Sequence, residues 1–254
     1  MSKIQEAFKN GKAFIPFITT GDPDLETTGK IVRAMAEAGA DLIELGIPFS
    51  DPTAEGPTIQ AANIRALSGG VTTDQIFDFV RELRKDVTVP LVFMTYANVV
   101  FSYGIDRFAA ACAEIGIDGL ILPDVPHEEK EEFAPAFRQR GIDFISLVAP
   151  TSENRIAEIA KDAEGFVYVV SSLGVTGERA EIRTNVDNMV AKIREVTDIP
   201  CAVGFGISTP EQAAALCADG VIVGSAIVKR IGQYGKDAAP KVAEYVREMK
   251  ASIS

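Results

Sequence analysis

The chain has 254 residues, close to the length of about 250 that one (β/α)8 barrel needs, so a single large domain is the first expectation. Hydrophobic residues make up 47% and charged residues 24% of the chain, which is ordinary globular composition and excludes a largely disordered protein. The net charge of -11 disfavours nucleic-acid binding, because most of the surface would repel a phosphate backbone.

Short apolar runs rich in β-branched residues alternate with helical patterns, which is typical of repeated βα units. Eight runs are predicted to be strands: Phe14–Thr19, Leu42–Leu45, Leu91–Thr95, Gly119–Leu122, Phe144–Val148, Phe166–Ser171, Ala202–Gly204 and Val221–Val223. Helical patterns cover Leu25–Ala38, Thr58–Ser68, Thr73–Lys85, Asp106–Ile115, Glu128–Arg140, Asn154–Asp162, Val186–Val196, Pro210–Cys217 and Lys236–Ser254. Candidate N-caps of these helices are Asp24, Thr72, Ser152 and Ser208 or Thr209.

The units follow one another from residue 1 to 254 without a linker, composition break or charge run, which predicts one domain. The pattern favours an α/β fold with a closed (β/α)8 TIM barrel over an open doubly wound sheet, which shares the alternation. A helix is expected before the first strand, an extra helix at Thr58–Ser68 after the second, and a closing amphipathic helix at the C-terminus. In such barrels the chemistry lies at the C-terminal ends of the strands.

Glu44 lies inside the second apolar run, where a carboxylate needs an explanation. Strand side chains alternate with a period of two, so Glu44 faces the barrel interior when Ile43 and Leu45 pack outward. Removal from water would raise its pKa and suit it to proton transfer near neutral pH. The alternative is a structural carboxylate paired with a lysine or arginine, although the adjoining runs carry almost no cationic side chains.

The loop Ser50–Thr58 follows this strand and carries two acids, Asp51 and Glu55, with two prolines and a glycine. Proline restricts the backbone and glycine permits unusual turns, so the loop is expected to hold a defined shape over the barrel mouth. Either acid could be a second acid or base, or could form a turn or cap a helix.

Glycine turns follow the seventh and eighth strands, at Gly204–Gly206 and Gly224–Ser225. Loops at these two strand ends, with a short helix N-terminus, form the recurrent phosphate site of this architecture. The sequence therefore predicts phosphate binding, with simple tight turns as the alternative. Because Pro210 interrupts any G-x-G-x-x-G pattern, a nicotinamide site is not supported, and no other cofactor motif is present.

Other features of the chain are less specific. The loop from Ser171 to Asn185 is expected to be a mobile lid or an ordinary surface loop. Tyr96 and Tyr168 could contact a ligand through their hydroxyls or pack in the core. The only histidine, His127, is expected in solvent at a helix start.

The cysteines and the N-terminal segment bear on compartment. Cys112, Cys201 and Cys217 are widely spaced and form no C-x-x-C pair, which favours reduced buried thiols over a zinc site. No apolar run reaches the roughly 18 residues of a membrane helix, and the polar segment Met1–Lys12 has no signal-peptide core. A soluble, cytoplasmic protein without a metal is expected.

Eight segments spread over nearly the whole chain form a recognisable set: Phe14–Pro23, Ile43–Pro52, Gly56–Gln60, Met94–Asn98, Pro123–Pro126, Gly174–Gly177, Val203–Ile207 and Val223–Ile227. Together they resemble the tryptophan synthase α subunit family. The second segment is the most specific, because other phosphate-binding barrels share the late glycines but not this acidic loop. The resemblance implies retro-aldol cleavage of indole-3-glycerol phosphate to indole and glyceraldehyde 3-phosphate, without a cofactor.

The resemblance implies that Glu44 is the acid/base that protonates indole C3 and handles the glycerol hydroxyl proton. The family's second acid is normally an aspartate that accepts the indole N–H proton, and Glu55 holds that position here. The additional methylene shifts the carboxylate by about 1.5 Å, and misplacement on the order of 1 Å can cost ~100-fold in rate unless the backbone compensates. The resemblance also assigns Phe17, Tyr96, Tyr168 and Phe205 to indole contacts or their neighbourhood, Thr176 to the lid, and Gly177, Gly206, Gly224 and Ser225 to phosphate.

A partner is implied as well. Pro48, Asp51 and Asn98 match positions that the family uses toward the β subunit of an αββα assembly, a pyridoxal-phosphate enzyme that condenses indole with serine. That cofactor belongs to the partner. Three other functions stay open: a subunit that mainly binds and activates the β partner, a free-standing lyase that releases indole, and another phosphate-handling barrel enzyme such as an isomerase of the same pathway.

Overall fold

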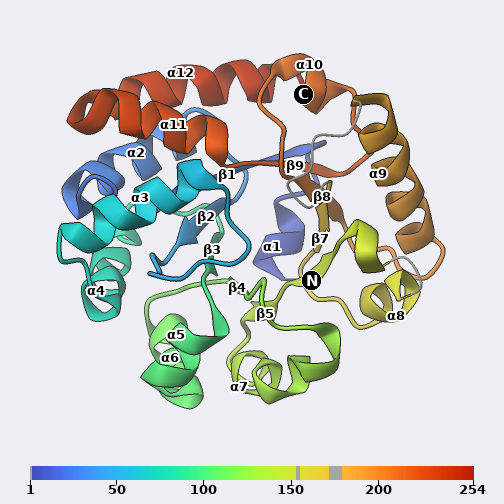
Figure 1. Cartoon of the computed structure of the whole chain (residues 1–254), viewed down its shortest axis with the longest axis horizontal. Coiled ribbons are helices and arrows are strands. Elements are labelled where there is room, and N and C mark those ends of the chain that lie inside the picture. The colour runs from blue at the N-terminus through green and yellow to red at the C-terminus, as the bar shows by residue number, and fades with distance from the viewer. Residues whose placement is uncertain (1, 153–154, 172–178) are drawn as a thin grey trace.

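The computed structural model describes residues 2–152, 155–171 and 179–254, which fold into an α/β barrel with helices outside the strands (Figure 1). Nine parallel strand segments form the sheet in this part of the chain: β1 (Ala13–Thr19), β2 (Ile43–Gly46), β3 (Leu91–Met94), β4 (Gly119–Ile121), β5 (Asp143–Phe144), β6 (Ser146–Val148), β7 (Val167–Val170), β8 (Cys201–Gly204) and β9 (Gly220–Val223). The predicted barrel is thereby confirmed. Because β1 pairs with β9, the first and last strand segments of the described residues are neighbours in one sheet.

The α-helices of the described residues are α1 (Lys3–Glu6), α2 (Leu25–Glu37), α3 (Pro57–Ser68), α4 (Thr73–Leu83), α5 (Ala97–Tyr103), α6 (Ile105–Glu114), α7 (Ala134–Arg138), α8 (Ile156–Lys161), α9 (Arg179–Arg194), α10 (Pro210–Ala214), α11 (Ser225–Tyr234) and α12 (Ala238–Ala251). Three 3-10 turns accompany them: η1 (His127–Glu132), η2 (Pro150–Ser152) and η3 (Gly235–Asp237). The extra helix after the second strand is α3, as expected, whereas α5 was not predicted. No helix in the described ranges is long and apolar enough to cross a membrane.

The expected fifth strand is broken in two at Ile145. Its first half, β5, pairs with β4 and its second half, β6, pairs with β7, so the sheet order runs β5-β4-β3-β2-β1-β9-β8-β7-β6. The Phe144 N–H donates to the Glu164 carboxylate at 2.9 Å, so a side chain takes the place of a strand carbonyl. The barrel is therefore closed through the covalent chain at Ile145.

Strand side chains alternate between the barrel interior and the outer core. On β2, Ile43 and Leu45 belong to the outer cluster that packs against helices. Glu44 lies between them in sequence and pairs in register with Phe17, a member of the inner cluster. The inward orientation predicted for Glu44 from the period of two is confirmed.

Polar side chains cap several of the predicted helices. Asp24, Thr72 and Thr209 each accept a hydrogen bond from the backbone N–H three residues later, a contact worth about 1 kcal/mol per helix. The prediction that Ser152 caps the next helix is wrong, because α8 begins at Ile156 and its N-cap is Arg155.

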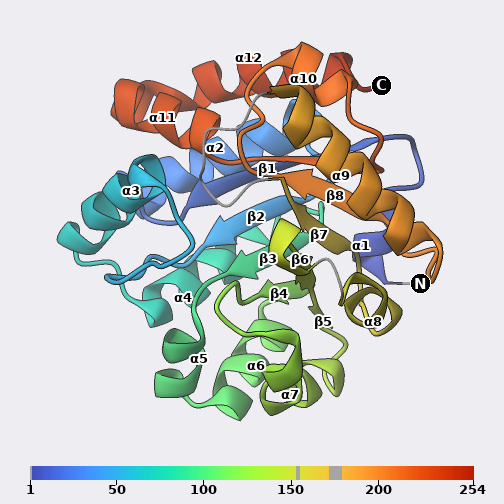
Figure 2. The ribbon, with the colours of Figure 1, turned by 45° about the vertical axis from the view of Figure 1, so that its right-hand side comes forward.

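The N-terminal helix α1 closes one end of the barrel (Figures 1 and 2). Its Ile4 is fully buried, and a Cβ on Gly119 of β4 would come within 2.7 Å of the Ile4 side chain. The Phe8 ring lies 5.7 Å from that of Phe166, at the start of β7. These contacts fill the end of the barrel at which the strands begin.

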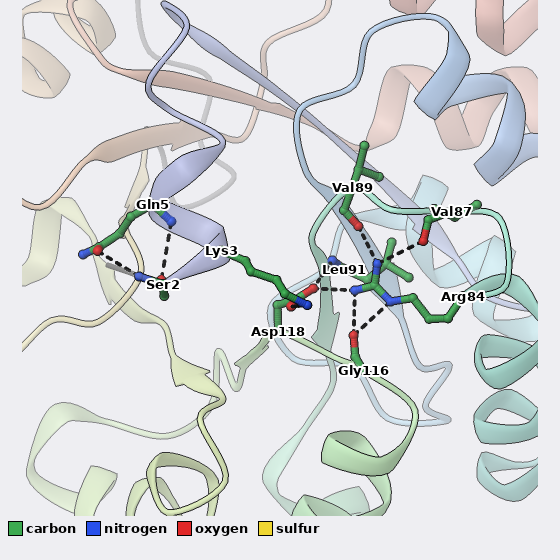
Figure 3. A network of polar contacts seen from close by, with 9 residues as sticks. All are labelled: Ser2, Lys3, Gln5, Arg84, Val87, Val89, Leu91, Gly116 and Asp118. Carbon is green, nitrogen blue, oxygen red and sulfur yellow. Dashed lines mark hydrogen bonds and ion pairs between the residues drawn. The ribbon is translucent and has the colours of Figure 1, made fainter.

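Arg84 ties together the loops at the same end (Figure 3). Its guanidinium donates to the Asp118 carboxylate and to three backbone carbonyls, those of Val87, Val89 and Gly116. Asp118 also accepts from the Leu91 N–H at 3.0 Å and lies 3.5 Å from the Lys3 ammonium. The network joins the approaches to β3 and β4, and it leaves the opposite end of the barrel for chemistry.

Candidate functional site

A cavity of about 1300 Å³ opens where the strands end, at the opposite end of the barrel from α1. It exceeds the usual 300 to 1,000 Å³ of small-molecule sites. Seven of the predicted site residues line it: Phe17, Glu55, Tyr168, Phe205, Gly206, Gly224 and Ser225. Glu44 and Tyr96 are buried behind its wall, and Thr176 and Gly177 lie outside the described residues.

Glu44 has no exposed surface, and neither of its carboxylate oxygens has a hydrogen-bond partner among the described residues. Burial raises its pKa from the usual 4.5 to about 8. At neutral pH the side chain is therefore a neutral carboxylic acid that can donate a proton. The structural alternative, a carboxylate held by a cation, does not fit these surroundings.

Two aromatic rings lie close to Glu44. Phe17 is the register neighbour of Glu44 on β1. Burial, the larger cause, raises the pKa of Tyr168 well above its usual value, and Tyr168 is close enough to Glu44 for the Glu44 charge to raise that pKa as well. Glycines make room for both rings: a Cβ on Gly46 would come within 2.7 Å of Phe17, and one on Gly204 within 2.5 Å of Tyr168. The rings give this part of the cavity an apolar wall suited to a flat aromatic group.

Glu55 lies half-buried in the loop after β2. Asn63 Nδ2 donates to its Oε2 at 2.6 Å, and the Tyr96 hydroxyl is a second hydrogen-bond partner. Burial raises the pKa of Glu55, and these two bonds act to lower it. The Tyr96 hydroxyl also accepts from the Ala54 N–H at 3.1 Å, so Tyr96 anchors the acidic loop from outside the cavity.

The predicted phosphate residues that the structure describes come together at the ends of β8 and β9. Phe205 and Gly206 have positive φ angles of 72° and 78°, which turn the chain tightly after β8. Gly224 is the N-cap of α11 and supplies no side-chain hydrogen bond, and Ser225 begins the helix. An uncapped helix N-terminus presents backbone N–H groups and the positive end of the helix dipole, as an anion requires.

Cationic groups of the cavity were missed from the sequence. Lys229 and Arg230 of α11 line it, and the spacing of four from Ser225 to Lys229 could have indicated a shared helix face. Lys130 is buried, and its ammonium donates to the Ser146 hydroxyl at 3.1 Å and the Asp162 carbonyl at 2.8 Å. Burial lowers the pKa of Lys130.

His127 and the cysteines differ in part from expectation. His127 is half-buried and lines the cavity, with its Nδ1 unbonded among the described residues, because one side of the otherwise exposed turn η1 faces the cavity. Cys112 and Cys201 are buried as expected, but Cys217 is exposed just after the short α10. In residues 2–152, 155–171 and 179–254 no group of three or more His, Cys, Asp or Glu could hold a metal ion.

The positions predicted to face a partner lie near the barrel mouth. Asp51 and Asn98 are exposed, whereas Pro48 is buried at the end of β2. Phe101 on α5 is 63% exposed and lies one turn from Asn98. An exposed phenylalanine beside polar side chains is a feature of protein contact surfaces.

A parallel barrel with a buried acid, aromatic walls and an uncapped helix N-terminus after its last strand is typical of (β/α)8 enzymes that bind a phosphate. The sequence model of the family described as tryptophan synthase alpha chain matches residues 4–254. The chain belongs to this family.

Relatives support the assignment over the full length. The tryptophan synthase alpha chain of Lacticaseibacillus casei is 49% identical over 255 residues, covering 100% of this chain and 96% of that protein. The structure of Mycobacterium tuberculosis tryptophan synthase matches with a TM-score of 0.90 and 36% identity, over 99% of this chain and 98% of that one. A tryptophan synthase complex from Pyrococcus furiosus matches with a TM-score of 0.86 and 36% identity. The match covers 95% of this chain and 99% of that one.

The family's reaction is the cleavage of indole-3-glycerol phosphate in tryptophan biosynthesis, a carbon-carbon lyase reaction. The alpha chain uses no cofactor for it, and pyridoxal phosphate belongs to the beta chain. Solved relatives include tryptophan synthase complexes, which implies a beta partner.

Proposed function

We propose that Glu44 and Glu55 carry the proton transfers by which this chain cleaves indole-3-glycerol phosphate. The observation that carries the proposal is Glu44, an acid with a pKa of about 8 buried next to the aromatic wall of the cavity. A catalytic acid works best when its pKa lies near the working pH. Glu55 lines the same cavity from the loop after β2.

The cavity offers different surroundings for the two ends of the substrate. Phe17, Tyr168 and Phe205 supply aromatic contacts for indole, with the Tyr168 and Phe205 rings 6.1 Å apart. Gly206, Gly224 and Ser225 supply backbone N–H groups and a hydroxyl for the phosphate. Thr176 and Gly177 stay proposed contacts on the resemblance alone.

The proton transfers balance with two acids. Glu44 donates its proton to indole C3, and Glu55 accepts the N–H proton, which leaves a C2–N double bond that can receive electrons. The Glu44 carboxylate then takes the glycerol hydroxyl proton, the bond from C3 to the glycerol carbon breaks, and the aldehyde forms. The bond electrons restore the indole ring, and nitrogen regains its proton from Glu55. Both acids end in their starting state.

The partner surface is inferred from the same end of the barrel. Asp51 and Asn98 would contact the beta chain directly, with Phe101 as the apolar centre of the patch. The buried Pro48 would act by shaping the loop above β2. The αββα stoichiometry and the cytoplasmic location stay predictions.

The first test is indole release from indole-3-glycerol phosphate by the purified chain, with and without a matched beta subunit. We expect low activity alone and strong stimulation by the partner. Absence of indole under both conditions, from a folded protein, would refute the proposed function, and high turnover indifferent to the partner would point to a free-standing lyase.

The second test replaces Glu44. Glu44→Gln keeps the shape of the side chain and removes its titrating proton, so we expect loss of indole release with folding retained. Glu26→Gln, at an exposed residue of α2 outside the cavity, is the matched control. A Glu44→Gln protein within a few-fold of the wild-type rate would reject the assignment of Glu44.

A further inference from the structure

Two side chains from different helices fix the Glu55 carboxylate. Asn63 of α3 is 4% exposed and donates its amide to Oε2 at 2.6 Å. Tyr96, the N-cap of α5, is 2% exposed and bonds the same carboxylate. The carboxylate is thus held from two sides at the wall of the cavity.

The place of Asn63 in α3 is unfavourable for the helix alone. Asparagine is a poor former of helix interiors, and a buried polar side chain costs free energy unless it is hydrogen-bonded. Its neighbours on the buried face of α3 are Ile59, Ala62 and Ala66. Helical side chains point toward the N-terminus of their helix, and Glu55 lies two residues before the start of α3. The amide is therefore directed back toward Glu55, and local rules of this kind are broken at functional positions.

We propose that Asn63 is a positioning residue for Glu55: its amide holds the Glu55 side chain where the carboxylate can accept the indole N–H proton. The inference rests on the proposed role of Glu55. A glutamate has one more rotatable bond than an aspartate, so more rotamers compete for its carboxylate. A hydrogen bond to a charged acceptor is strong enough to select one of them.

The same bond sets the charge of Glu55. Burial raises its pKa, while the Asn63 bond favours the ionised form that a base requires. Among the described residues Glu55 has no ion pair. Tyr96 is the titratable group in contact with it, and the charge of Asp124 also acts on Tyr96. Removing the amide should therefore move the titration of Glu55 to higher pH.

The test is a double-mutant cycle on indole release with Asn63→Ala, Glu55→Ala and both changes together. In the protein that keeps Glu55, Asn63→Ala should lower kcat by about 10- to 100-fold with a smaller effect on KM. The acidic limb of its kcat/KM profile should move to higher pH. Combined with Glu55→Ala, the same change should alter the residual rate by less than about 3-fold. An equal loss in both backgrounds would overturn the proposal.

Gln60→Ala is the matched control, because Gln60 donates to the Glu55 backbone carbonyl at 2.8 Å and does not hold the carboxylate. Its acidic limb should stay in place. If the acidic limb of Gln60→Ala shifted as much as that of Asn63→Ala, the role of Asn63 would be to hold the loop and not the Glu55 carboxylate, which would overturn the proposal. If Asn63→Ala does not fold, Asn63→Asp is the second variant, because it keeps the shape of the side chain and places a second acid next to Glu55. The acidic limb of its kcat/KM profile should move to higher pH by more than that expected for Asn63→Ala.

A measurement without substrate separates this inference from the proposed function. Carbon-13 NMR titration of labelled glutamate carboxyls, with Glu55 assigned from Glu55→Gln, should show a higher Glu55 pKa in Asn63→Ala than in wild type. An unchanged titration would refute the inference even if the wild-type protein cleaves indole-3-glycerol phosphate. A shifted titration in a protein that releases no indole would instead refute the proposed function alone.

Discussion

Burial of Glu44 should make the stability of this protein fall as the pH rises, and Glu44→Gln should remove that part of the dependence. Its pKa is about 8 in the folded protein against 4.5 in water. Below pH 4.5 both states keep the proton, so the group has no effect. Between the two values only the folded state keeps it, so each pH unit lowers the free energy of unfolding by about 1.4 kcal/mol. The full loss, reached above the folded pKa, is about 5 kcal/mol.

Urea unfolding of wild type and Glu44→Gln near pH 6 and near pH 8.5 measures this effect. The stability of Glu44→Gln relative to wild type should rise by about 2 to 3 kcal/mol between the two conditions. Glu26→Gln, an exposed control, should follow the wild-type curve. Parallel pH dependence of wild type and Glu44→Gln would show that Glu44 is ionised in the folded protein and would refute the reasoning.

Three further predictions concern other parts of the barrel. Gly46→Ala places a Cβ 2.7 Å from the Phe17 ring, so unfolding should become easier by about 1 to 3 kcal/mol and KM for indole-3-glycerol phosphate should rise; unchanged values of both would contradict the packing. Arg84→Ala leaves three backbone carbonyls without this donor and removes the main cationic partner of Asp118, so calorimetry or urea unfolding should show a loss of about 3 kcal/mol; a change near zero would show that the network does not stabilise the fold. Phe101→Asp should reduce stimulation by the beta subunit while leaving the indole release of the isolated chain in place, and full stimulation would exclude Phe101 from the interface.

The strands and the orientation of Glu44 could be predicted because both follow from periodicity. Ile43 and Leu45 alternate with Glu44. Because these two side chains pack on the outer face of the strand, the Glu44 carboxylate must face the barrel interior. The positions of Gly206 and Gly224 could also be predicted from the sequence, because each follows directly after one of the last two strands of the barrel.

The remaining features depend on contacts between distant segments. Asn63 is one polar residue in an ordinary helical pattern, and only the fold shows that its amide meets Glu55. Lys130 lies in an acidic stretch that looks solvent-exposed, yet the fold buries its ammonium against Ser146. The break at Ile145 could not be seen within the single predicted strand Phe144–Val148, because the Glu164 side chain that replaces a strand partner there comes from elsewhere in the sequence.

That break gives the barrel a seam. The edges β5 and β6 meet along it with one strand neighbour each, and side chains bridge it: Glu164 reaches Phe144, and Lys130 reaches Ser146. Widening the seam would lengthen these side-chain hydrogen bonds and would not break the backbone hydrogen bonds that pair the strands on either side. Because Lys130 and Ser146 also line the cavity, the width of the seam helps to set the size of the chamber. One wall of the chamber is thus joined by side-chain hydrogen bonds, whereas backbone pairing between strands joins the others.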